Sequence, residues 1–164
     1  GKPGVTKVEG ALAAGSAVLQ ALRAASTALD EAEVPLTERY LFITPTLLQG
    51  INDMDTTKSK KVLEGFEQVI KVPQRRFYTA IKQLSGKTGE EAGGYTKATG
   101  AANINFAIVQ KDALIQYTKH AAPKIIAPEN NPDADAYVFG YRMVGIAKAY
   151  KNMLSGMYFS HDKA

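Results

Sequence analysis

Apolar residues recur at helical spacing between residues 16 and 33. They follow one another at steps of about one helical turn, which places them on one face of a helix. This face comprises Val18, Leu22, Ala25 and Leu29. Ser16 is a suitable N-cap because a serine hydroxyl can accept a hydrogen bond from an amide of the first turn. Pro35 disfavours helical geometry at the residue before it, so the helix is expected to end near Glu33.

A short aromatic and branched run, residues 40–43, follows this helix and predicts a strand. Thr44 and Pro45 then provide an N-cap followed by proline at the first helical position, so a second, short helix is expected to run to Ile51. The unit of helix, turn, strand and short helix is the best specified part of the chain. We read residues 1–15, before this unit, as a loose lead-in that is rich in glycine and alanine.

The middle of the chain is less regular. Residues 52–61 are polar without an apolar period, which predicts an exposed loop. Residues 66–72 alternate imperfectly between apolar and polar, which predicts a strand that Pro73 ends. Residues 73–86 are read as a turn with a short helix. Residues 86–100 are glycine-rich with little that could be buried, so we expect a flexible excursion there.

The second half begins with an apolar run at 104–109, read as a strand, and an amphipathic run at 111–119, read as a short helix. This pair resembles the earlier strand and short helix in pattern, as one supersecondary idea used twice. Three further strands are expected at 124–127, 137–150 and 156–160. A polar, proline-containing turn separates the first two.

The order of these elements predicts the fold class. Strands and helices do not alternate strictly, so an α+β fold with a mixed sheet and flanking helices fits better than a doubly wound sheet. The chain has 164 residues, 45% hydrophobic and 22% charged, which suffices for one domain with a core. The net charge of +4 permits contact with a polyanion without requiring it.

Several classes of protein are disfavoured by composition. The chain has no cysteine, which excludes disulfides, thiolate metal sites and thiol nucleophiles. No apolar run approaches the ~20 residues of a membrane helix, so no membrane partner is expected. Because the first residue is Gly1 rather than methionine, we expect a processed product or an excised piece of a longer protein.

Motifs for catalysis and for cofactors are incomplete. The run at 86–88 ends like a phosphate-binding loop, but Ile81 stands where the first glycine would be. His120 and His161 are far apart in sequence and lack the spacing of zinc ligands. Asp133 and Asp135 start like a calcium loop that the following residues do not continue. We expect no catalytic, cofactor-binding or metal-binding residues.

Two basic clusters are candidates for binding. Lys58, Lys60 and Lys61 are most simply explained as the solvated side of a loop, although lysines can contact nucleic-acid phosphates. Arg75 and Arg76 are followed by two aromatic residues, a combination that suits a protein–protein contact.

Two long stretches resemble the major capsid proteins of tailed bacteriophages and prophages. The first is ALDEAEVPLTERYLFITPTLLQGI, from residue 28, where an acidic helix end, Val-Pro, an Arg-Tyr strand and a proline-started helix follow one another. The second is FAIVQKDALIQYTKHAAPKIIAPENNPDADAYVFGYRMVGIAKAYKNMLSGMYFSH, from residue 106, with a polar Pro-Asp turn, a Gly-Tyr-Arg strand and a final Gly-x-Tyr strand. Together they cover about half of the chain.

The resemblance implies the Hong Kong 97-type capsid fold. Residues 16–135 would correspond mainly to the axial domain and residues 136–164 to strands that return to the peripheral domain. The N-terminal arm, the extended loop and the long spine helix of the family would lie upstream. The function implied is that of a structural protein, not an enzyme, that self-assembles as pentamers and hexamers into an icosahedral shell. The virion would be its location and the host cytoplasm its place of assembly.

In that family, axial-domain loops meet around the five-fold and six-fold axes. By position, the candidate subunit-contact residues are Pro73, Gln74, Arg75, Arg76, Phe77, Tyr78, Gly86, Lys87, Gly93, Gly94 and Tyr95. Packaged DNA is a further candidate partner through non-specific charge. The motifs give no ground for assigning the Lys–Asn cross-link that some relatives form.

Two alternatives stay open at this point. One is a small basic nucleic-acid-binding module that uses the lysine and arginine clusters, with an affinity that falls steeply with salt. The other is a small hydrolase whose Ser-His-Asp triad includes His120 and is dispersed along the chain, since triad members need not be adjacent in sequence.

Overall fold

The computed structural model of the chain describes residues 5–13, 15–54 and 57–163. It divides into two compact units. Unit 1 comprises Gly1–Ala113 and Lys151–Ala164, and unit 2 comprises Leu114–Tyr150. The expected boundary between axial-like and returning parts, at residues 135 and 136, falls in the turn of unit 2, and its assignment to capsid domains stays a prediction.

Unit 1 is built on a five-stranded mixed sheet with the order β1-β9-β6-β2-β3. The outer pairs β1–β9 and β2–β3 are parallel, and the inner pairs β2–β6 and β6–β9 are antiparallel. The strands are β1 (Thr6–Glu9), β2 (Arg39–Ile43), β3 (Gln68–Lys71), β6 (Ile104–Gln110) and β9 (Met157–His161). The mixed sheet with helices confirms the expected α+β class.

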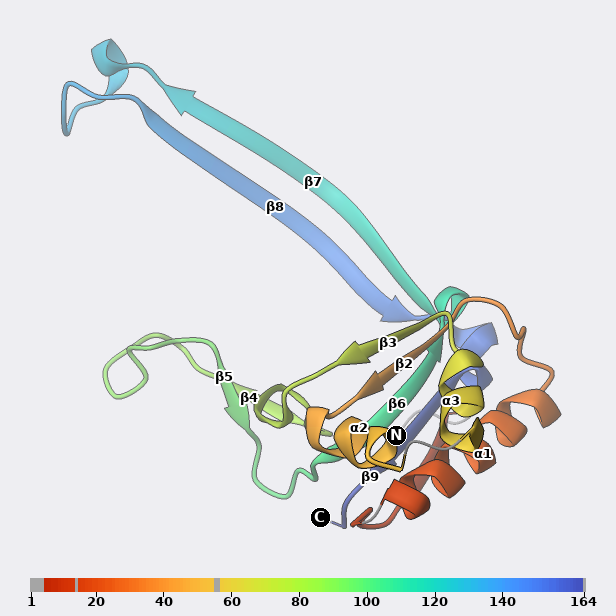
Figure 1. Ribbon diagram of the computed structural model, residues 1–164. Coiled ribbons are helices and arrows are strands. Elements are labelled where there is room, and N and C mark those ends of the chain that lie inside the picture. Colours follow the sequence, from red (N-terminus) through yellow and green to blue (C-terminus); the bar gives the residue numbers. More distant parts are fainter. Residues whose placement is uncertain (1–4, 14, 55–56, 164) are drawn as a thin grey trace. The chain divides into compact units, whose positions relative to one another are not determined.

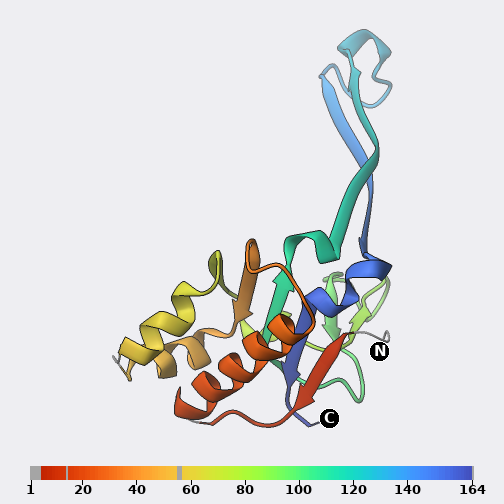
Figure 2. The same ribbon diagram turned by 90° about the vertical axis from the view of Figure 1, so that its right-hand side faces the viewer.

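Three helices lie against one face of this sheet (Figures 1 and 2). They are α1 (Gly15–Glu31), α2 (Pro45–Asn52) and α3 (Thr57–Glu64). The four apolar residues expected on one face of α1 are all buried there, together with Leu19. They meet alternate residues of the central strands: Leu41 is paired with Ile108, and Ile43 with Phe106. The helical period of α1 and the two-residue period of the strands thus build one core.

The segment of residues 16–51 folds largely as the sequence predicts. The strand β2 and the short helix α2 are confirmed, with Pro45 at the first helical position. Thr44 occupies the N-cap position, but its side chain makes no capping hydrogen bond. Helix α1 begins at Gly15, so Ser16 lies inside its first turn and the prediction of an N-cap at Ser16 is wrong.

Other expectations are corrected. Residues 57–64 form α3 rather than a loop, because Val62 and Leu63 pack on the core although no longer apolar period exists. The lead-in contains β1, which pairs with β9 at the edge of the sheet. The strands expected at 66–72, 104–109 and 156–160 are confirmed as β3, β6 and β9. No helix within the described ranges has the length and apolar character needed to cross a membrane.

Unit 2 is a long antiparallel ribbon of β7 (Leu114–Ile126) and β8 (Val138–Ala149). The expected short helix at 111–119 is wrong: a 3-10 turn, Lys111–Ala113, leads directly into β7. The second half therefore does not repeat the strand-and-helix pattern of the first. The cause is non-local, because the residues of β7 are held by pairing with β8, up to 35 positions away. The strands expected at 124–127 and 137–150 are confirmed as parts of β7 and β8, and the polar turn lies between them.

Candidate subunit-contact surface

The first group of candidate contact residues forms a tight turn after β3. We call residues 73–78 the arginine turn. Gln74–Arg76 form a 3-10 turn, in which the amide of Arg76 donates to the carbonyl of Pro73 at 2.9 Å. The Gln74 side chain closes it by donating from Nε2 to the carbonyl of Phe77 at 3.0 Å. Both arginine side chains are exposed at the apex. The turn with a short helix that the sequence predicts is present, as a single 3-10 turn.

The far end of the arginine turn is tied to the central sheet. The amide of Ile104, the first residue of β6, donates to the carbonyl of Phe77 at 3.0 Å. Tyr78 forms an isolated antiparallel bridge with Asn103. The next residue, Thr79, accepts a hydrogen bond at Oγ1 from the amide of Ala102 at 2.9 Å. Three consecutive residues therefore hold the turn on the start of a fully buried strand, which limits its freedom.

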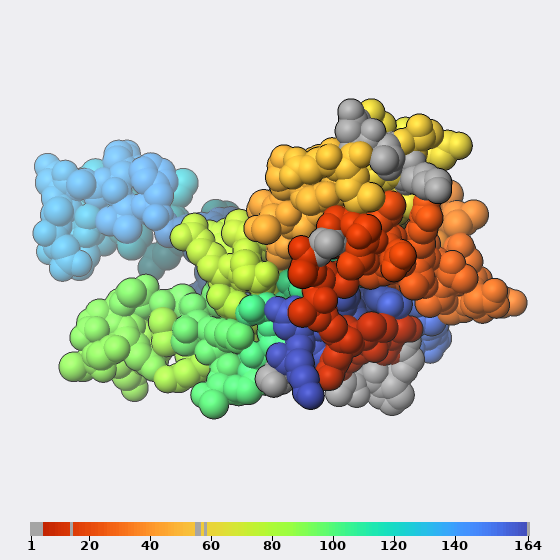
Figure 3. All heavy atoms as spheres, turned by 60° about the horizontal axis from the view of Figure 1, so that its bottom comes forward, coloured from red at the N-terminus to blue at the C-terminus, as the bar shows by residue number. Residues whose placement is uncertain are grey.

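The second group lies on a small hairpin that the arginine turn leads into. Its strands are β4 (Ile81–Gln83) and β5 (Tyr95–Lys97), paired antiparallel with Gln83 opposite Tyr95. We call residues 84–94 the glycine loop, because they connect these strands. In Figure 3 this segment, coloured green, stands out from unit 1. Gly93 and Gly94 have φ of +59° and +80°, a left-handed pair that residues with a Cβ rarely adopt, so glycine is required there.

The glycine loop is organised by one carboxylate. Glu90 accepts hydrogen bonds at 2.8 Å from Lys82 Nζ, from the Ser85 amide and from Ser85 Oγ. The hydrogen bond from Lys82, followed by those from Ser85, lowers the pKa of Glu90 to about 2. Glu91 accepts from the amide of Gly89 at 2.7 Å, which lowers its pKa as well. Part of the predicted excursion is thus a hydrogen-bonded loop on a hairpin.

One lysine joins the two groups. Lys97 Nζ lies 5.6 Å from the centre of the Tyr78 ring and donates to Asn103 Oδ1 at 3.0 Å. A cation over an aromatic face is attracted by the negative potential of the ring. The structure therefore brings Tyr78 of the arginine turn next to β5, the strand that begins with Tyr95. Gly86, Lys87, Gly93 and Gly94 lie in the glycine loop between β4 and β5.

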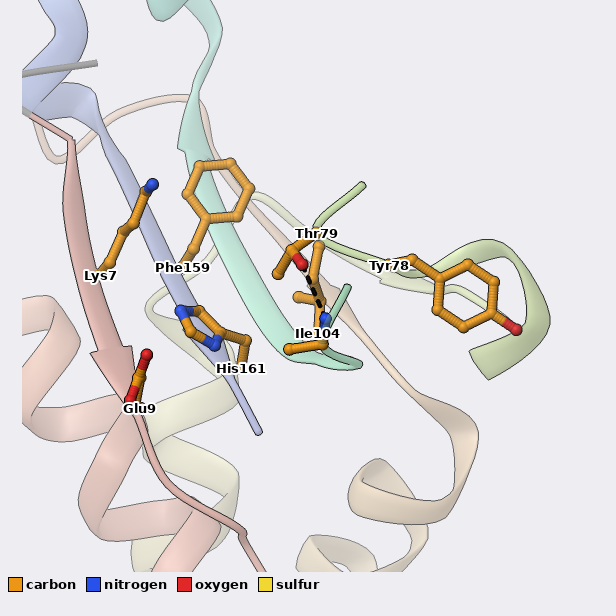
Figure 4. A pocket seen from close by; sticks show the side chains of 8 residues that line it. Lys7, Glu9, Tyr78, Thr79, Ile104, Phe159 and His161 are labelled. Carbon is orange, nitrogen blue, oxygen red and sulfur yellow. Dashed lines mark hydrogen bonds between the residues drawn. The ribbon is translucent and has the colours of Figure 1, made fainter. Parts of the chain in front are cut away.

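A hollow of about 520 Å³ lies beside the arginine turn (Figure 4). It is lined by Lys7, Glu9, Tyr78, Thr79, Ala102, Ile104, Phe159 and His161. Glu9 and His161 are cross-strand partners in the β1–β9 pair, and Lys7 is opposite Phe159. Sequence reasoning missed this hollow because it depends on β1, whose four residues carry too short an alternation to stand out.

The remaining candidates do not converge on a chemical site. The predicted loop cluster lies on α3, where Lys61 is in the last turn; the side chain of Lys58 is outside the described part of the chain. His120 belongs to β7 of unit 2, whereas His161 belongs to β9 of unit 1. Asp133 and Asp135 lie in the polar turn of the ribbon. Among the described residues, no three His, Asp or Glu side chains are grouped so that they could hold a metal ion.

Comparison with known proteins identifies the fold. No family model matches the chain, and no curated protein matches it. Among solved structures, the chain is similar to a chain of the capsid structure of the cyanophage P-SCSP1u, with a TM-score of 0.56 and 18% sequence identity. The match covers 97% of this chain and 53% of that chain, so this chain spans about half the length of the capsid chain. The fold is therefore phage-capsid-like.

Proposed function

We propose that this chain is part of a major capsid protein of Hong Kong 97 type from a tailed phage or prophage. It is a structural component of the virion and not an enzyme. Copies of it assemble into the shell in the host cytoplasm. Residues 16–135 supply mainly the axial domain, and residues 136–164 return to the peripheral domain. The N-terminal arm, the extended loop and the spine helix are encoded upstream.

The observation that carries this proposal is the fold likeness to a cyanophage capsid chain over 97% of the sequence. A fold alone does not fix a function, so a second line of support is needed. The segments that begin at residues 28 and 106 supply it, because the order of their residues resembles that of capsid proteins. A match to about half of the capsid chain is what a piece without its upstream segments would give.

The arginine turn and the glycine loop are the proposed contacts around the symmetry axes. Arginine and tyrosine are enriched in the cores of protein–protein interfaces. Arg75, Arg76 and Tyr78 lie in the arginine turn, and Tyr95 begins β5 directly after the glycine loop. Arg75, Arg76 and Tyr95 are exposed, while the backbone that carries them is tied to β6 and to Glu90. A contact held this way loses little conformational entropy when a neighbour binds. In a ring, each copy would offer this surface to a different surface of the next copy.

Light scattering and electron microscopy of the parent gene product, beside the 164-residue chain, test the proposal. We expect the parent to form rings of five or six copies, or closed particles. A parent that stays monomeric at high concentration would overturn the capsid role.

A charge reversal then tests the contact assignment in the parent. Arg75→Glu should reduce the yield of rings or particles, because the exposed guanidinium would be replaced by a carboxylate at the contact. Arg23→Glu is the matched control, since Arg23 is an exposed arginine on α1, away from both segments. Equal yields from the two variants would remove the arginine turn from the contact.

A further inference from the structure

The ribbon of unit 2 leaves its strands unprotected. A two-stranded ribbon is marginally stable in water unless its faces are covered. Most side chains of β7 and β8 are exposed, and they include large apolar groups. The most exposed on β8 are Phe139 at 74% and Tyr141 at 69%. Monomeric proteins rarely expose contiguous apolar surface on this scale, which indicates that a partner covers one face of the ribbon.

The pairing register sorts the residues of the ribbon into two faces. Cross-strand partners point to the same side of a ribbon, and successive residues of one strand point to opposite sides. One set carries no charge, and we call it the uncharged face. It comprises Leu114, Gln116, Thr118, Ala121, Pro123, Ile125, Phe139, Tyr141, Met143, Gly145, Ala147 and Ala149.

The other set carries the charges, and we call it the cationic face. It comprises Ile115, Tyr117, His120, Ala122, Lys124, Ile126, Val138, Gly140, Arg142, Val144, Ile146 and Lys148. Neither β7 nor β8 contains an aspartate or a glutamate, so no anion offsets these cations on the strands. Lys119 lies at the register shift between Thr118 and His120 and has no cross-strand partner, so the pairing assigns it to neither set, and the two sets keep their composition on either side of it.

We propose that the uncharged face is a docking surface for the uncharged face of a second copy of this chain. A symmetric contact brings a patch against itself. The cationic face would meet Lys124, Arg142 and Lys148 of the other copy and be repelled, and desolvating those charges would add a cost. The uncharged face meets only apolar and neutral groups. Charge therefore selects which of two largely apolar faces can associate with itself.

The size and composition of the uncharged face fit such a contact. Its five large side chains, Leu114, Ile125, Phe139, Tyr141 and Met143, are 52–74% exposed. They present on the order of 600 Å² if a large side chain contributes 150–250 Å². A stable interface buries roughly 800 Å² on each partner, and the neutral residues between them can supply the remainder. Tyr137 stacks on Phe139 with ring centroids 6.2 Å apart, which pre-arranges an aromatic platform at one end.

Two adjacent residues give a matched test. Met143 belongs to the uncharged face and is 58% exposed, whereas Val144 belongs to the cationic face and is 45% exposed. Because the chain has no cysteine, Met143→Cys and Val144→Cys each introduce one reporter thiol. We measure the rate of maleimide labelling of each variant of the 164-residue chain from dilute to concentrated solution. Circular dichroism checks that both variants fold.

The expected result is that labelling of the thiol at 143 slows roughly tenfold when about nine-tenths of the copies are associated, while labelling at 144 changes little. Met143→Lys should abolish the association seen by sedimentation, and Val144→Lys should leave it. Equal slowing at both sites, or no slowing at either, would overturn the proposal. So would labelling at 143 that is equally slow at every concentration. That last result would mean that another part of the same copy covers the uncharged face.

The inference uses the proposed capsid role only for the premise that copies meet, and the two can fail separately. Rings or particles of the parent together with a freely reactive thiol at 143 would remove the docking face and leave the capsid role. Concentration-dependent protection at 143 together with a monomeric, ring-free parent would leave self-docking of the chain and remove the capsid role.

Discussion

Arg39 Nη1 donates a 2.7 Å hydrogen bond to Asp30 Oδ1, joining the first residue of β2 to the end of α1. The arginine side chain is 3% exposed and the aspartate side chain is 51% exposed. Arg39 also donates from Nε to the carbonyl of Pro35 at 2.8 Å and from Nη2 to the carbonyl of Val34. One buried guanidinium therefore satisfies the turn between helix and strand, with a half-exposed carboxylate as its counter-ion.

Arg39→Met should destabilise the fold by about 3 kcal/mol, because two carbonyls and a carboxylate lose their donor in a mostly buried place. Asp30→Asn should cost less than about 1 kcal/mol, since the amide oxygen can still accept and the site is half exposed. Urea unfolding followed by circular dichroism measures both. Similar losses for the two variants would show that the ion pair, not the buried donor set, dominates.

Gly15 and Gly50 provide a second pair with opposite expectations. A Cβ on Gly15, at the start of α1, would lie 2.1 Å from the carbonyl oxygen of Gly50 in α2. A Cβ on Gly50 would find Gly15 Cα at 3.6 Å, an ordinary contact. Gly15→Ala should therefore destabilise by about 1–3 kcal/mol through overpacking.

Gly50→Ala should be neutral or stabilising by up to about 1 kcal/mol, because alanine is the better helix former. Thermal melts of both variants under identical conditions test this difference. An unchanged melting temperature for Gly15→Ala would mean that α1 and α2 do not approach closely in solution.

Phe106→Ala should cost about 3–5 kcal/mol, since Phe106 is fully buried and stacks on Tyr158 with ring centroids 6.1 Å apart. The control is Phe42→Ala on the opposite face of the sheet, where the ring is half-buried, and the loss should be smaller. Chemical denaturation of both variants checks the difference. Equal losses would contradict the view that the helix-covered face holds the main core.

The pH dependence of the glycine loop follows from Glu90. Its folded-state pKa, about 2, lies below the ordinary value of 4.5, so its contribution to loop order is fully present above about pH 4.5 and is lost as the pH falls towards 2. NMR measures the protection factor of the Ser85 amide, which is the exchange rate of an unstructured amide at the same pH divided by its own. This factor should stay high down to about pH 4 and fall below it. Glu90→Gln should accelerate exchange at neutral pH, whereas Lys82→Met should raise the pKa of Glu90. If the Glu90 carboxyl titrated near 4.5 in the unmodified chain, this hydrogen-bond network would be ruled out.

The elements that the sequence predicts well are those with local causes. The apolar period of α1, the run of β2 and the Thr44–Pro45 start of α2 each lie within one segment, and each is confirmed. Helix α3 and strand β1 were missed because two apolar residues, or four residues at an edge, carry too little pattern. For residues 111–119, the apolar positions fit both the helical and the strand period. Pairing with the distant strand β8 decides that most of them form a strand.

The candidate contact surface also combines features that depend on local sequence with features that depend on tertiary pairing. Position in the chain was enough to name Tyr78 and Tyr95 as candidate contact residues, and the structure places Tyr78 in a bridge to Asn103 and Tyr95 in β5. Position alone could not show that Lys97 lies over Tyr78, that Glu90 orders the glycine loop, or that β1 completes a hollow beside them. These relations depend on tertiary pairing between segments, which residue order leaves open.

The register shift at Lys119 decides which side of the ribbon each later residue of β7 faces. If Lys119 were paired with Val144 and the register did not shift, every later position of β7 would change sides. His120 and Lys124 would then pair with Met143 and Phe139 on the uncharged face. Because side chains alternate with a period of two, the single unpaired residue in β7 keeps His120 and Lys124 off the uncharged face. Deleting Lys119 would remove the irregularity and make Thr118–Gly145 and His120–Val144 consecutive pairs, with the composition of both faces unchanged.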